Sequence, residues 1–372
     1  MLPAHCPVAS RVDFRHPREP FHHRRIKQLI RDVTITMTQL VTGSTAKVRL
    51  TAEREGPRYY GHLWVFDSNV AEVLGTPAAG DLVDVYTHQK RFFGRGLFNP
   101  HSKIRIRMLT FQEEPIDEEF FAARLRAAAA LRRTVAPHAT ACRLVHGESD
   151  LLPGLVVDRF AEVAVMQTLG YGMDVRKELL GELLVQEAGV KTVYLRNDAK
   201  SRTLEGLPLS KGFLRGEGAT TVNIHEGKAQ FTVDIAEGQK TGWFCDQREN
   251  RIAAALFAKG KTVLEAFCRT GGFSIQAALA GAQSVEGLDV SAAAVALAQA
   301  HAEQNQVAAR CQYRQADAFE ELRLLERNGQ RYDLVILDPP AFARSKKAVP
   351  HAIAGYKEVN LRGLRLLQPG GV

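Results

Sequence analysis

From Lys261 onward, strand-like and helix-like segments alternate, and this rhythm limits the possible folds more than any other feature of the chain. The apolar segments "KTVLEAF", "SVEGLDV" and "RYDLVILDPP" resemble buried strands, whereas "GGFSIQAALAG", "SAAAVALAQAHAEQNQ" and "YKEVNLRGLRLLQPGG" have helical spacing. Alternation of this kind is typical of a doubly wound parallel sheet. The sequence therefore predicts an α/β domain in its C-terminal third.

This predicted sheet looks incomplete. The segment "LVILD" is apolar on both faces, which is typical of a central strand. The closing "LQPGGV" is a turn of the kind that precedes another strand, and a strand such as "LVILD" at an exposed edge would favour aggregation. We therefore expect the sequence to be a C-terminally truncated form of a longer protein.

Two further regions precede the α/β domain. From Lys47 to Phe111, four segments alternate apolar and polar residues between glycine, proline and asparagine breaks, which indicates a small β-barrel or sandwich. From Ala141 to Ile235, a hairpin, further strands and a helix closed by Gly189 indicate an α+β domain. The predicted order is a disordered leader or mis-called start (1–36), a β domain (37–113), a linker helix (114–139), an α+β middle domain (140–236) and the α/β domain (237–372).

Charge and cysteine content narrow the class of protein. The net charge of +8 favours a polyanionic partner. Five cysteines, an odd number without a CxxC pair, argue against a disulfide framework and against a zinc site, so we expect no metal and a cytoplasmic location. The chain has no stretch of about 18 apolar residues that would cross a membrane. Its Arg-rich N-terminus lacks the apolar core of a signal peptide, and Met37 would be a natural alternative start.

Ligands of open parallel sheets bind at the carboxyl ends of the strands, and notable residues follow several predicted strands. Gly271 and Gly272 allow a ligand to approach the backbone, although the turn is not the G-x-G-x-x-G of dinucleotide-binding enzymes. Asp289 can accept hydrogen bonds from both hydroxyls of a ribose, and Asp317 can accept one from an adenine amino group. Each aspartate alone would be an ordinary helix cap, but together they favour an adenosine-containing ligand.

The segment "LDPPAF", Leu337 to Phe342, is the most specific signal in the chain. Its two prolines fix the backbone and remove two hydrogen-bond donors, so that carbonyl groups and the Asp338 carboxylate are left as acceptors. Phe342 offers a face on which a planar base can stack. We therefore take Asp338, Pro339 and Phe342 as candidate catalytic residues.

These motifs carry a resemblance to a known family. The C-terminal region resembles class I S-adenosylmethionine-dependent methyltransferases, with "LDPPAF" similar to their motif IV and "VLEAFCRTGGFS" to motif I. With "KTGWFCDQRENR", "RLVHGESDLLPGLVVDRF" and "GYKEVN", the chain from about Val41 to Val372 is similar to the bacterial 23S rRNA (cytosine-carbon-5)-methyltransferase family. The resemblance implies an N-terminal PUA domain, a mixed middle domain, a Rossmann-like catalytic domain, S-adenosylmethionine as cofactor and 23S rRNA as partner.

The resemblance also implies roles for individual residues. Glu265, Phe267, Thr270 and Gly271 resemble the methionine-binding loop, Asp289 the ribose ligand, Asp317 the adenine ligand, and Asp338 with Pro339 the catalytic motif. The segment that lines the cofactor and target-base site corresponds to Lys240, Thr241, Gly242, Phe244, Asp246, Gln247 and Arg248. The chain departs from the family at Arg269, where an aromatic residue is usual, and this puts the local packing of the turn in doubt.

The carbon-5 reaction needs a thiolate that adds at carbon-6 of the cytosine, while Asp338 would hold the edge of the base. In the resembling family this cysteine lies on the strand after "LQPGGV", so the nucleophile is expected beyond Val372. Cys245 and Cys268 fall inside the presumed pocket segments, but a buried cysteine is usually an inert small apolar residue. We therefore expect the chain as written to bind the cofactor weakly and not to methylate.

The β domain interleaves basic and aromatic residues in "RYYGHLWVFDSNV", "HQKRFFGRGLFNPHSK" and "IRIRM", a pattern that suits RNA but also suits a strand core. Two alternatives stay open. A methyltransferase acting on the exocyclic N2 of guanine in rRNA would use the same acceptors and need no cysteine. A non-catalytic RNA-binding or assembly protein would need neither the cysteine nor an intact cofactor pocket.

Overall fold

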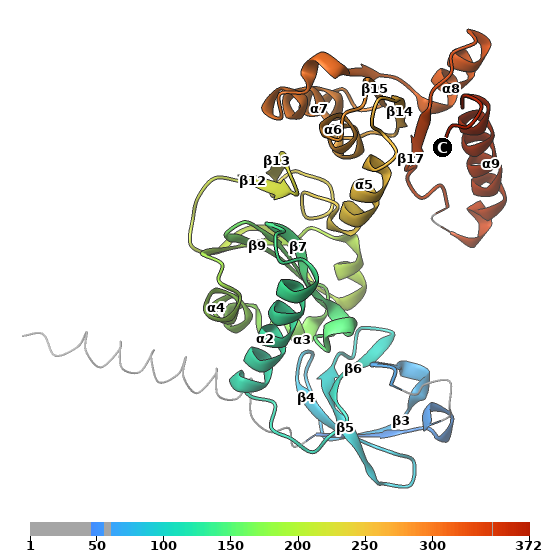
Figure 1. Ribbon diagram of the computed structural model, residues 1–372. Helices are drawn as coiled ribbons and strands as arrows, with labels where there is room; N and C mark the ends of the chain where they lie inside the picture. Colours follow the sequence, from blue (N-terminus) through green and yellow to red (C-terminus); the bar gives the residue numbers. More distant parts are fainter. Residues whose placement is uncertain (1–45, 56–60, 344) are drawn as a thin grey trace, which may run out of the picture.

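The computed structural model describes residues 46–55, 61–343 and 345–372, and Figure 1 shows three units that follow one another along the molecule. The expected leader, residues 1–36, lies outside the described residues. A β unit forms one end, a mixed unit forms the middle, and the predicted α/β unit forms the other end (Figure 1). No helix in the described ranges combines the length and the apolar character needed to cross a membrane.

The first unit is built on a six-stranded sheet, with β2-β6-β5-β4-β1-β3 as the order of its described strands. Alternate residues of these strands, such as Val48, Val83 and Ile106, are buried in one core. The four predicted strand segments are confirmed, and two short strands were missed. The elements are β1 (Lys47–Leu50), η1 (Ala52–Glu55), β2 (Trp64–Phe66), η3 (Asp67–Asn69), β3 (Val70–Leu74), β4 (Leu82–Tyr86), β5 (Phe92–Phe98) and β6 (Ile104–Thr110).

Helix α2 (Glu118–Val135) connects the first unit to the second. Asp117 caps its N-terminus by accepting a hydrogen bond from the Phe120 amide at 3.0 Å. Phe121 and Leu125 are fully buried in the core of the middle unit. The predicted linker helix is therefore also a part of the middle unit's core.

The middle unit contains a five-stranded sheet in the order β11-β10-β9-β8-β7. The predicted hairpin is the antiparallel pair β8 and β9, and Gly189, at φ +67°, ends α4 as expected. The elements are β7 (Ala141–His146), η4 (Gly147–Asp150), β8 (Leu155–Phe160), β9 (Val163–Thr168), α3 (Tyr171–Asp174), α4 (Lys177–Ala188), β10 (Thr192–Asn197), η5 (Lys200–Glu205) and β11 (Ser210–Arg215).

A separate antiparallel hairpin, β12 (Thr221–Glu226) and β13 (Ala229–Asp234), precedes the α/β unit. It packs on that unit: the Gln230 amide donates to the Asn305 side chain at 2.8 Å, and the Thr232 amide contacts His301 Nε2 at 3.0 Å. The strand expected from "AQFTVDI" is therefore present. The boundary between residues 236 and 237 stays a prediction.

The α/β unit has four described parallel strands in the order β16-β15-β14-β17. Val263 packs into one core and its neighbour Leu264 into another, so helices cover both faces of the sheet and the predicted doubly wound fold is confirmed. The elements are η6 (Cys245–Gln247), α5 (Arg248–Ala255), β14 (Thr262–Ala266), α6 (Gly272–Leu279), β15 (Ser284–Asp289), α7 (Ala292–Gln304), η7 (Ala308–Arg310), β16 (Cys311–Gln315), α8 (Ala318–Arg327), β17 (Leu334–Leu337), η8 (Lys346–Ala348) and α9 (Val349–Arg365).

Strand β17, which contains "LVIL", lies last in this order of described strands. The backbone of Val372 runs along its other side, accepting from the Val335 amide and donating to the Asp333 carbonyl, both at 2.9 Å. The C-terminus of the printed sequence therefore lies beside β17 and α9 (Figure 1).

Candidate functional site

The carboxyl ends of the parallel strands bring the predicted site residues to one edge of the sheet. After β14 the chain turns sharply, with positive φ angles at Phe267 (65°), Arg269 (52°) and Gly271 (77°). Such angles are uncommon outside glycine and often mark functional turns. A Cβ atom on Gly271 would lie 2.8 Å from the Tyr313 hydroxyl, so only glycine fits at that point. Gly271 is itself buried and directly precedes α6, so the turn packs closely against Tyr313.

Asp289 lies at the end of β15, beside this turn. Its Oδ2 accepts a hydrogen bond from the Arg269 amide at 2.8 Å, and its Oδ1 accepts one from the Ser291 amide at 2.9 Å. A carboxylate oxygen can accept two hydrogen bonds, so each oxygen retains room for a ligand hydroxyl. The half-buried carboxylate thus suits a pair of ribose hydroxyls.

Asp317 follows β16 and caps α8. Its Oδ1 accepts from the Phe319 amide at 2.8 Å and from the Glu320 amide at 3.2 Å. Its other carboxylate oxygen makes no hydrogen bond within the described part of the chain, and the side chain is exposed. The structure thus shows Asp317 as a helix cap, and the contact with adenine stays a prediction.

Glu265 lies below the turn rather than on its surface. Its side chain is almost completely buried and accepts hydrogen bonds from the Ser274 amide, at 2.8 Å, and from the Ser274 hydroxyl. Burial raises its pKa to about 7, although the hydrogen bonds from Ser274 favour the charged form. Glu265 therefore joins β14 to the first turn of α6, and its contact with a methionine group stays a prediction.

Asp338 begins the proline turn after β17 and is half-buried. Burial raises the pKa of its carboxyl group, and the positive charge of Arg269 opposes this shift. The Gln247 side chain donates to Asp338 Oδ1 at 3.3 Å, so the segment before α5 reaches the catalytic candidate as expected. An acceptor held in this way can bind the edge of a nucleobase.

Aromatic rings surround the proline turn. The Phe342 ring lies 4.5 Å from Tyr356 of α9, 5.6 Å from Phe319 and 6.5 Å from Phe267, measured between ring centroids. The Tyr356 hydroxyl donates to the Pro340 carbonyl at 3.5 Å and accepts from the Phe342 amide at 3.4 Å. Pro339 lies between Asp338 and this cluster, which fixes the geometry of the turn. Our sequence reasoning did not assign roles to Phe319 and Tyr356, although Tyr356 belongs to the quoted "GYKEVN" motif.

The Lys240–Arg251 segment lies against the turn after β14. The Phe244 ring has Lys240 Nζ at 4.1 Å and the Arg269 guanidinium carbon at 3.7 Å from its centroid. Lys240 is also ion-paired with Asp246 at 3.5 Å. The segment therefore forms a cationic and aromatic wall beside Asp338.

Other predicted residues of this segment are engaged within the protein. Thr241 is fully buried and donates to Asp158 of β8, which is also ion-paired with Arg143. Arg248 pairs with its neighbour Glu249 at 2.9 Å. The Thr270 carbonyl contacts His301 Nδ1 at 2.9 Å. These residues fix the walls of the site, and direct contact with a cofactor stays a prediction for each of them.

Sequence reasoning missed the residues that hold this wall in place. Arg251 pairs with the buried Glu226 of β12 at 2.6 Å, and the Trp243 indole donates to the same carboxylate at 2.7 Å. A Cβ atom on Gly272 would lie 2.9 Å from Arg251 Cδ, so the pair also packs against the beginning of α6. Glu226 ends β12, a strand that the sequence analysis did not predict, and its sequence position gives no signal of this contact.

Burial makes each of the described cysteines a poor nucleophile. It raises the pKa of Cys142, raises the pKa values of Cys245 and Cys268 well above the ordinary range, and raises that of Cys311 to about 11. Thiolates are the reactive form, so the pocket cysteines Cys245 and Cys268 are not activated. No group of three or more His, Cys, Asp or Glu side chains in the described ranges could hold a metal ion.

Comparison with known proteins agrees with this geometry. Residues 48–111 match the family model of a PUA-like domain, and residues 208–372 match that of an S-adenosylmethionine-dependent methyltransferase. A putative methyltransferase described as SMU.776 and complexed with SAH has the same fold, with a TM-score of 0.73 and 23% identity over 87% of this chain and 84% of that chain. A putative SAM-dependent methyltransferase from Streptococcus mutans gives a TM-score of 0.71 and 22% identity over the same shares.

The chain is therefore a class I S-adenosylmethionine-dependent methyltransferase that carries a PUA-like domain. Ribosomal RNA large subunit methyltransferase I of Shewanella denitrificans is 41% identical over 88% of this chain and 84% of that protein. The protein of that name from Alteromonas mediterranea is 40% identical over the same shares. The chain belongs to the ribosomal RNA large subunit methyltransferase I family.

The site's residues fit S-adenosylmethionine, which the family uses. The half-buried carboxylate of Asp289 has acceptor sites for the ribose, and it is hydrogen-bonded to the half-buried Arg269 of the turn. The aromatic rings of Phe267 and Phe319 lie 6.4 Å apart near the end of β14 and offer an apolar surface for a base.

Proposed function

We propose that the function of this protein is the methylation of carbon-5 of a cytosine in 23S rRNA, with S-adenosylmethionine as the methyl donor. The observation that carries this proposal is the position of Asp338, half-buried at the same sheet edge as Asp289 and the Gly271 turn. An acceptor at this position supports the binding of a target base beside the proposed cofactor site. Family membership supports the choice of large-subunit rRNA.

In this proposal each side of the site has one task. S-adenosylmethionine, when bound, supplies an electrophilic methyl group. Asp338 accepts a hydrogen bond from the edge of the target base and stabilises charge that develops on the ring. Phe342 stacks beneath the base, and Pro339 fixes the direction of the Asp338 carboxylate. The remaining proposed cofactor residues are Lys240, Thr241, Phe244, Asp246, Gln247, Arg248, Glu265, Phe267, Thr270, Gly271, Asp289 and Asp317.

The PUA-like unit supplies the proposed RNA surface. Lys47 is exposed and lies over the Tyr86 ring at 5.5 Å, whereas Arg95, which lies over Phe92 at 6.0 Å, is half-buried and paired with Asp84. By contrast, Arg54 and Arg107 are buried and belong to the fold. The basic and aromatic pattern of the sequence is thus divided between core and surface. RNA binding through this unit should weaken as salt increases, and the cytoplasm is the compartment that the proposal implies.

Two chemistries remain in competition. The carbon-5 reaction requires a thiolate, and burial raises the pKa of each described cysteine, so the proposal requires a thiol outside the described residues. The same observation favours methylation of the N2 atom of guanine as the second candidate, because that reaction needs acceptors such as Asp338 but no thiolate.

Analysis of the methylated nucleoside tests the proposal. The protein is incubated with unmodified 23S rRNA and isotopically labelled S-adenosylmethionine, and the rRNA is digested to nucleosides for mass spectrometry. Labelled 5-methylcytidine supports the proposal, whereas label confined to N2-methylguanosine supports the second candidate instead.

A substitution at Asp338 tests its catalytic role in the same assay. Asp338→Asn should reduce transfer by about 100-fold or more, the usual effect of removing a group that stabilises the transition state. Binding of S-adenosylhomocysteine, measured by calorimetry, should change little. Unchanged turnover would refute the catalytic role of Asp338.

A further inference from the structure

Arg269 has an unusual environment for an arginine. Its guanidinium carbon lies 3.7 Å from the centroid of the Phe244 ring, and the residue is half-buried. Within the described part of the chain, its side-chain nitrogens make no hydrogen bond and no ion pair. Its backbone amide donates to Asp289 at 2.8 Å, and its carbonyl accepts from the Cys268 thiol at 3.8 Å. Stacking on a ring occupies the face of a guanidinium and leaves its five in-plane N–H donors open to solvent or to a ligand.

The contrast with Arg251 shows what a structural arginine looks like in the same unit. The Arg251 side chain is also close to Phe244, but it has protein partners. It donates to both oxygens of Glu226 at 2.8 and 2.6 Å and to the Phe244 carbonyl at 3.0 Å. A partly desolvated cation without such partners is costly unless a ligand supplies them. The donors of Arg269 are therefore available for an anionic group.

The position of Arg269 limits what that group can be. Its backbone, at φ 52°, lies in the turn between β14 and α6, and its amide binds Asp289, the proposed ribose ligand. The residue is thus part of the turn along which the cofactor would extend. The PUA-like unit, which carries the proposed RNA surface, lies at the opposite end of the molecule (Figure 1).

The charges around Arg269 further limit which anionic group it can bind. Asp338, Asp289 and Asp246 are the acidic groups that act on the Arg269 charge. This cluster of carboxylates disfavours a ligand whose charges are all negative, such as a phosphodiester chain, and suits one that also carries a positive charge. The methionine end of the cofactor carries one carboxylate and one ammonium group, and so it matches a site with an unsatisfied cation beside acids. Lys240, on the same Phe244 ring, adds a second positive charge.

We infer that Arg269 binds the carboxylate of the methionine group of S-adenosylmethionine. This inference rests on the proposed cofactor site and assigns a specificity-determining contact within it. The family that the sequence resembles usually has an aromatic residue at this position, and an aromatic ring cannot form the paired hydrogen bonds that a guanidinium donates to a carboxylate. The interaction is therefore a property of this chain's own residue.

Calorimetric titration with a pair of ligands tests the inference without any need for turnover. One ligand is S-adenosylhomocysteine, and the other is its decarboxylated analogue, which lacks only the carboxylate. Wild-type protein should bind the analogue about 10- to 100-fold more weakly, the range expected for a charge-assisted hydrogen-bonded pair. Arg269→Gln should weaken S-adenosylhomocysteine by the same factor and leave the affinity for the analogue within about twofold.

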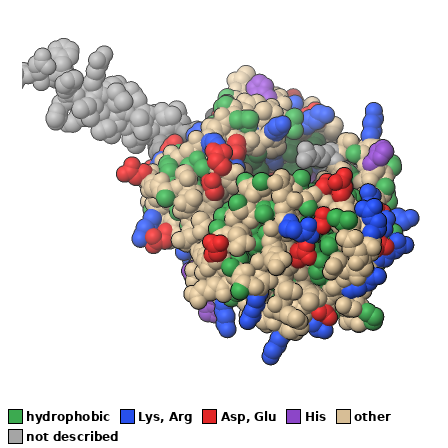
Figure 2. Space-filling view, turned by 90° about the horizontal axis from the view of Figure 1, so that it is seen from above, with side chains coloured by type: hydrophobic (Ala, Val, Ile, Leu, Met, Phe, Trp, Pro, Cys, Tyr) green, Lys and Arg blue, Asp and Glu red, His purple; other side chains and the backbone are tan. Residues whose placement is uncertain are grey.

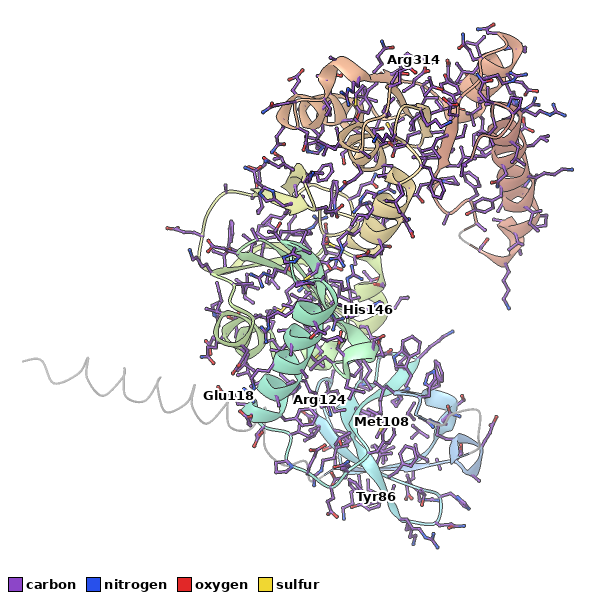
Figure 3. All side chains as sticks on the ribbon, viewed as in Figure 1. Tyr86, Met108, Glu118, Arg124, His146 and Arg314 are labelled. Atoms are coloured by element: carbon purple, nitrogen blue, oxygen red, sulfur yellow. The ribbon has the colours of Figure 1, made fainter. Side chains whose placement is uncertain are left out.

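Two further variants complete the experiment. Arg269→Lys keeps the charge and should retain an intermediate preference for the carboxylate, so it carries the test if Arg269→Gln fails to fold. Arg314→Gln is the matched control, because Arg314 lies on β16 at the outer end of the α/β unit and pairs with Glu286 and Glu321 (Figure 3). It should bind both ligands as wild type does.

The outcomes separate the inference from the proposed function. Equal weakening of both ligands by Arg269→Gln would overturn the inference, because it would show that Arg269 only shapes the turn. Loss of rRNA binding with both ligand affinities unchanged would also overturn it and would assign Arg269 to a phosphate. Failure of wild-type protein to bind S-adenosylhomocysteine would instead overturn the cofactor site itself.

Discussion

Glu265 is a carboxyl group with its charge suppressed by burial. It is 2% exposed, and its pKa rises from the ordinary 4.5 to about 7. Because the folded-state pKa is raised, the folded chain binds this proton more tightly than the unfolded chain does. The resulting stabilisation is fully present below pH 4.5 and is lost as the pH rises through about 7. A shift of this size corresponds to on the order of 3 kcal/mol.

Glu265→Gln should remove this pH dependence, since an amide can still accept from Ser274 but does not titrate. We expect the variant to be more stable than wild type at pH 8 by up to about 3 kcal/mol, with little difference at pH 4. Urea unfolding at the two pH values measures this. Asp333→Asn is the matched control, because the bonds from Thr262 lower the pKa of Asp333 and give the opposite trend. A stability difference independent of pH would contradict the assignment.

The pattern of strands was enough to select candidate site residues that lie at one edge of the sheet. Asp289, Asp338 and Gly271 follow strands where a parallel sheet usually binds its ligand, and their roles stay predictions. The pattern could not show that Thr241 points away to Asp158, because the two residues are 83 positions apart in the sequence. Nor could it show that Arg269 stacks on Phe244, since this contact depends on how the turn folds.

At the scale of elements, one buried carboxylate joins the hairpin of β12 and β13 to the Lys240–Arg251 segment, the cationic and aromatic wall beside Asp338. Glu226 is fully buried, and Arg251, which is 4% exposed, binds both of its oxygens. Trp243 donates to the same group, and Arg251 also holds the Phe244 carbonyl. The position of the Phe244 ring therefore depends on the hairpin.

Glu226→Gln should destabilise the protein by about 3–5 kcal/mol, because it leaves a buried guanidinium without a compensating charge. The loss would be read from urea unfolding curves. Glu249→Gln is the control, since Glu249 forms an exposed pair with Arg248 and should contribute less than about 1 kcal/mol. Similar losses of unfolding free energy in both variants would show that the pair of Glu226 and Arg251 does not hold the Lys240–Arg251 segment in place.

The predicted elements agree with the structure where the pattern is long and periodic, as in β14, α6, β15 and α7. Short strands were missed: β2 spans only Trp64–Phe66, too few residues for an alternation to be visible. Helix α9 begins at Val349, before the predicted start at Tyr356, with a proline in its first turn. The local sequence pattern therefore predicted whether a segment is a helix or a strand more reliably than it predicted the first and last residues of that element.

At the scale of the whole molecule, the PUA-like unit is fixed to the middle unit by a second buried carboxylate. Glu205 of η5 is 5% exposed and accepts from Ser102 at 2.6 Å, from Arg107 at 2.8 Å and from Asn99 at 3.1 Å. Figure 3 shows Met108, the neighbour of Arg107, inside the PUA-like unit. Three donors from one unit thus converge on one acceptor from the other.

This contact of Glu205 with Ser102, Arg107 and Asn99, here called the joint, matters because the proposed RNA surface and Asp338 lie in different units (Figure 1). Figure 2 shows that Lys and Arg side chains also gather on one side of the face seen from above, which belongs to the α/β end of the molecule. An RNA that contacts both ends must match the orientation that the joint sets. Loosening the joint should therefore affect the RNA substrate and not the cofactor.

Glu205→Ala should leave Arg107 without its buried partner and destabilise the protein by about 3–5 kcal/mol. At a temperature where the variant is folded, we expect an increased KM for rRNA, because the PUA-like unit is no longer held in one orientation. The affinity for S-adenosylhomocysteine should be unchanged, because Glu205 lies outside the cofactor site. Glu72→Ala, which removes only an exposed pair with Arg49, should alter neither quantity. An unchanged KM in Glu205→Ala would mean that the two units bind RNA independently of their mutual orientation.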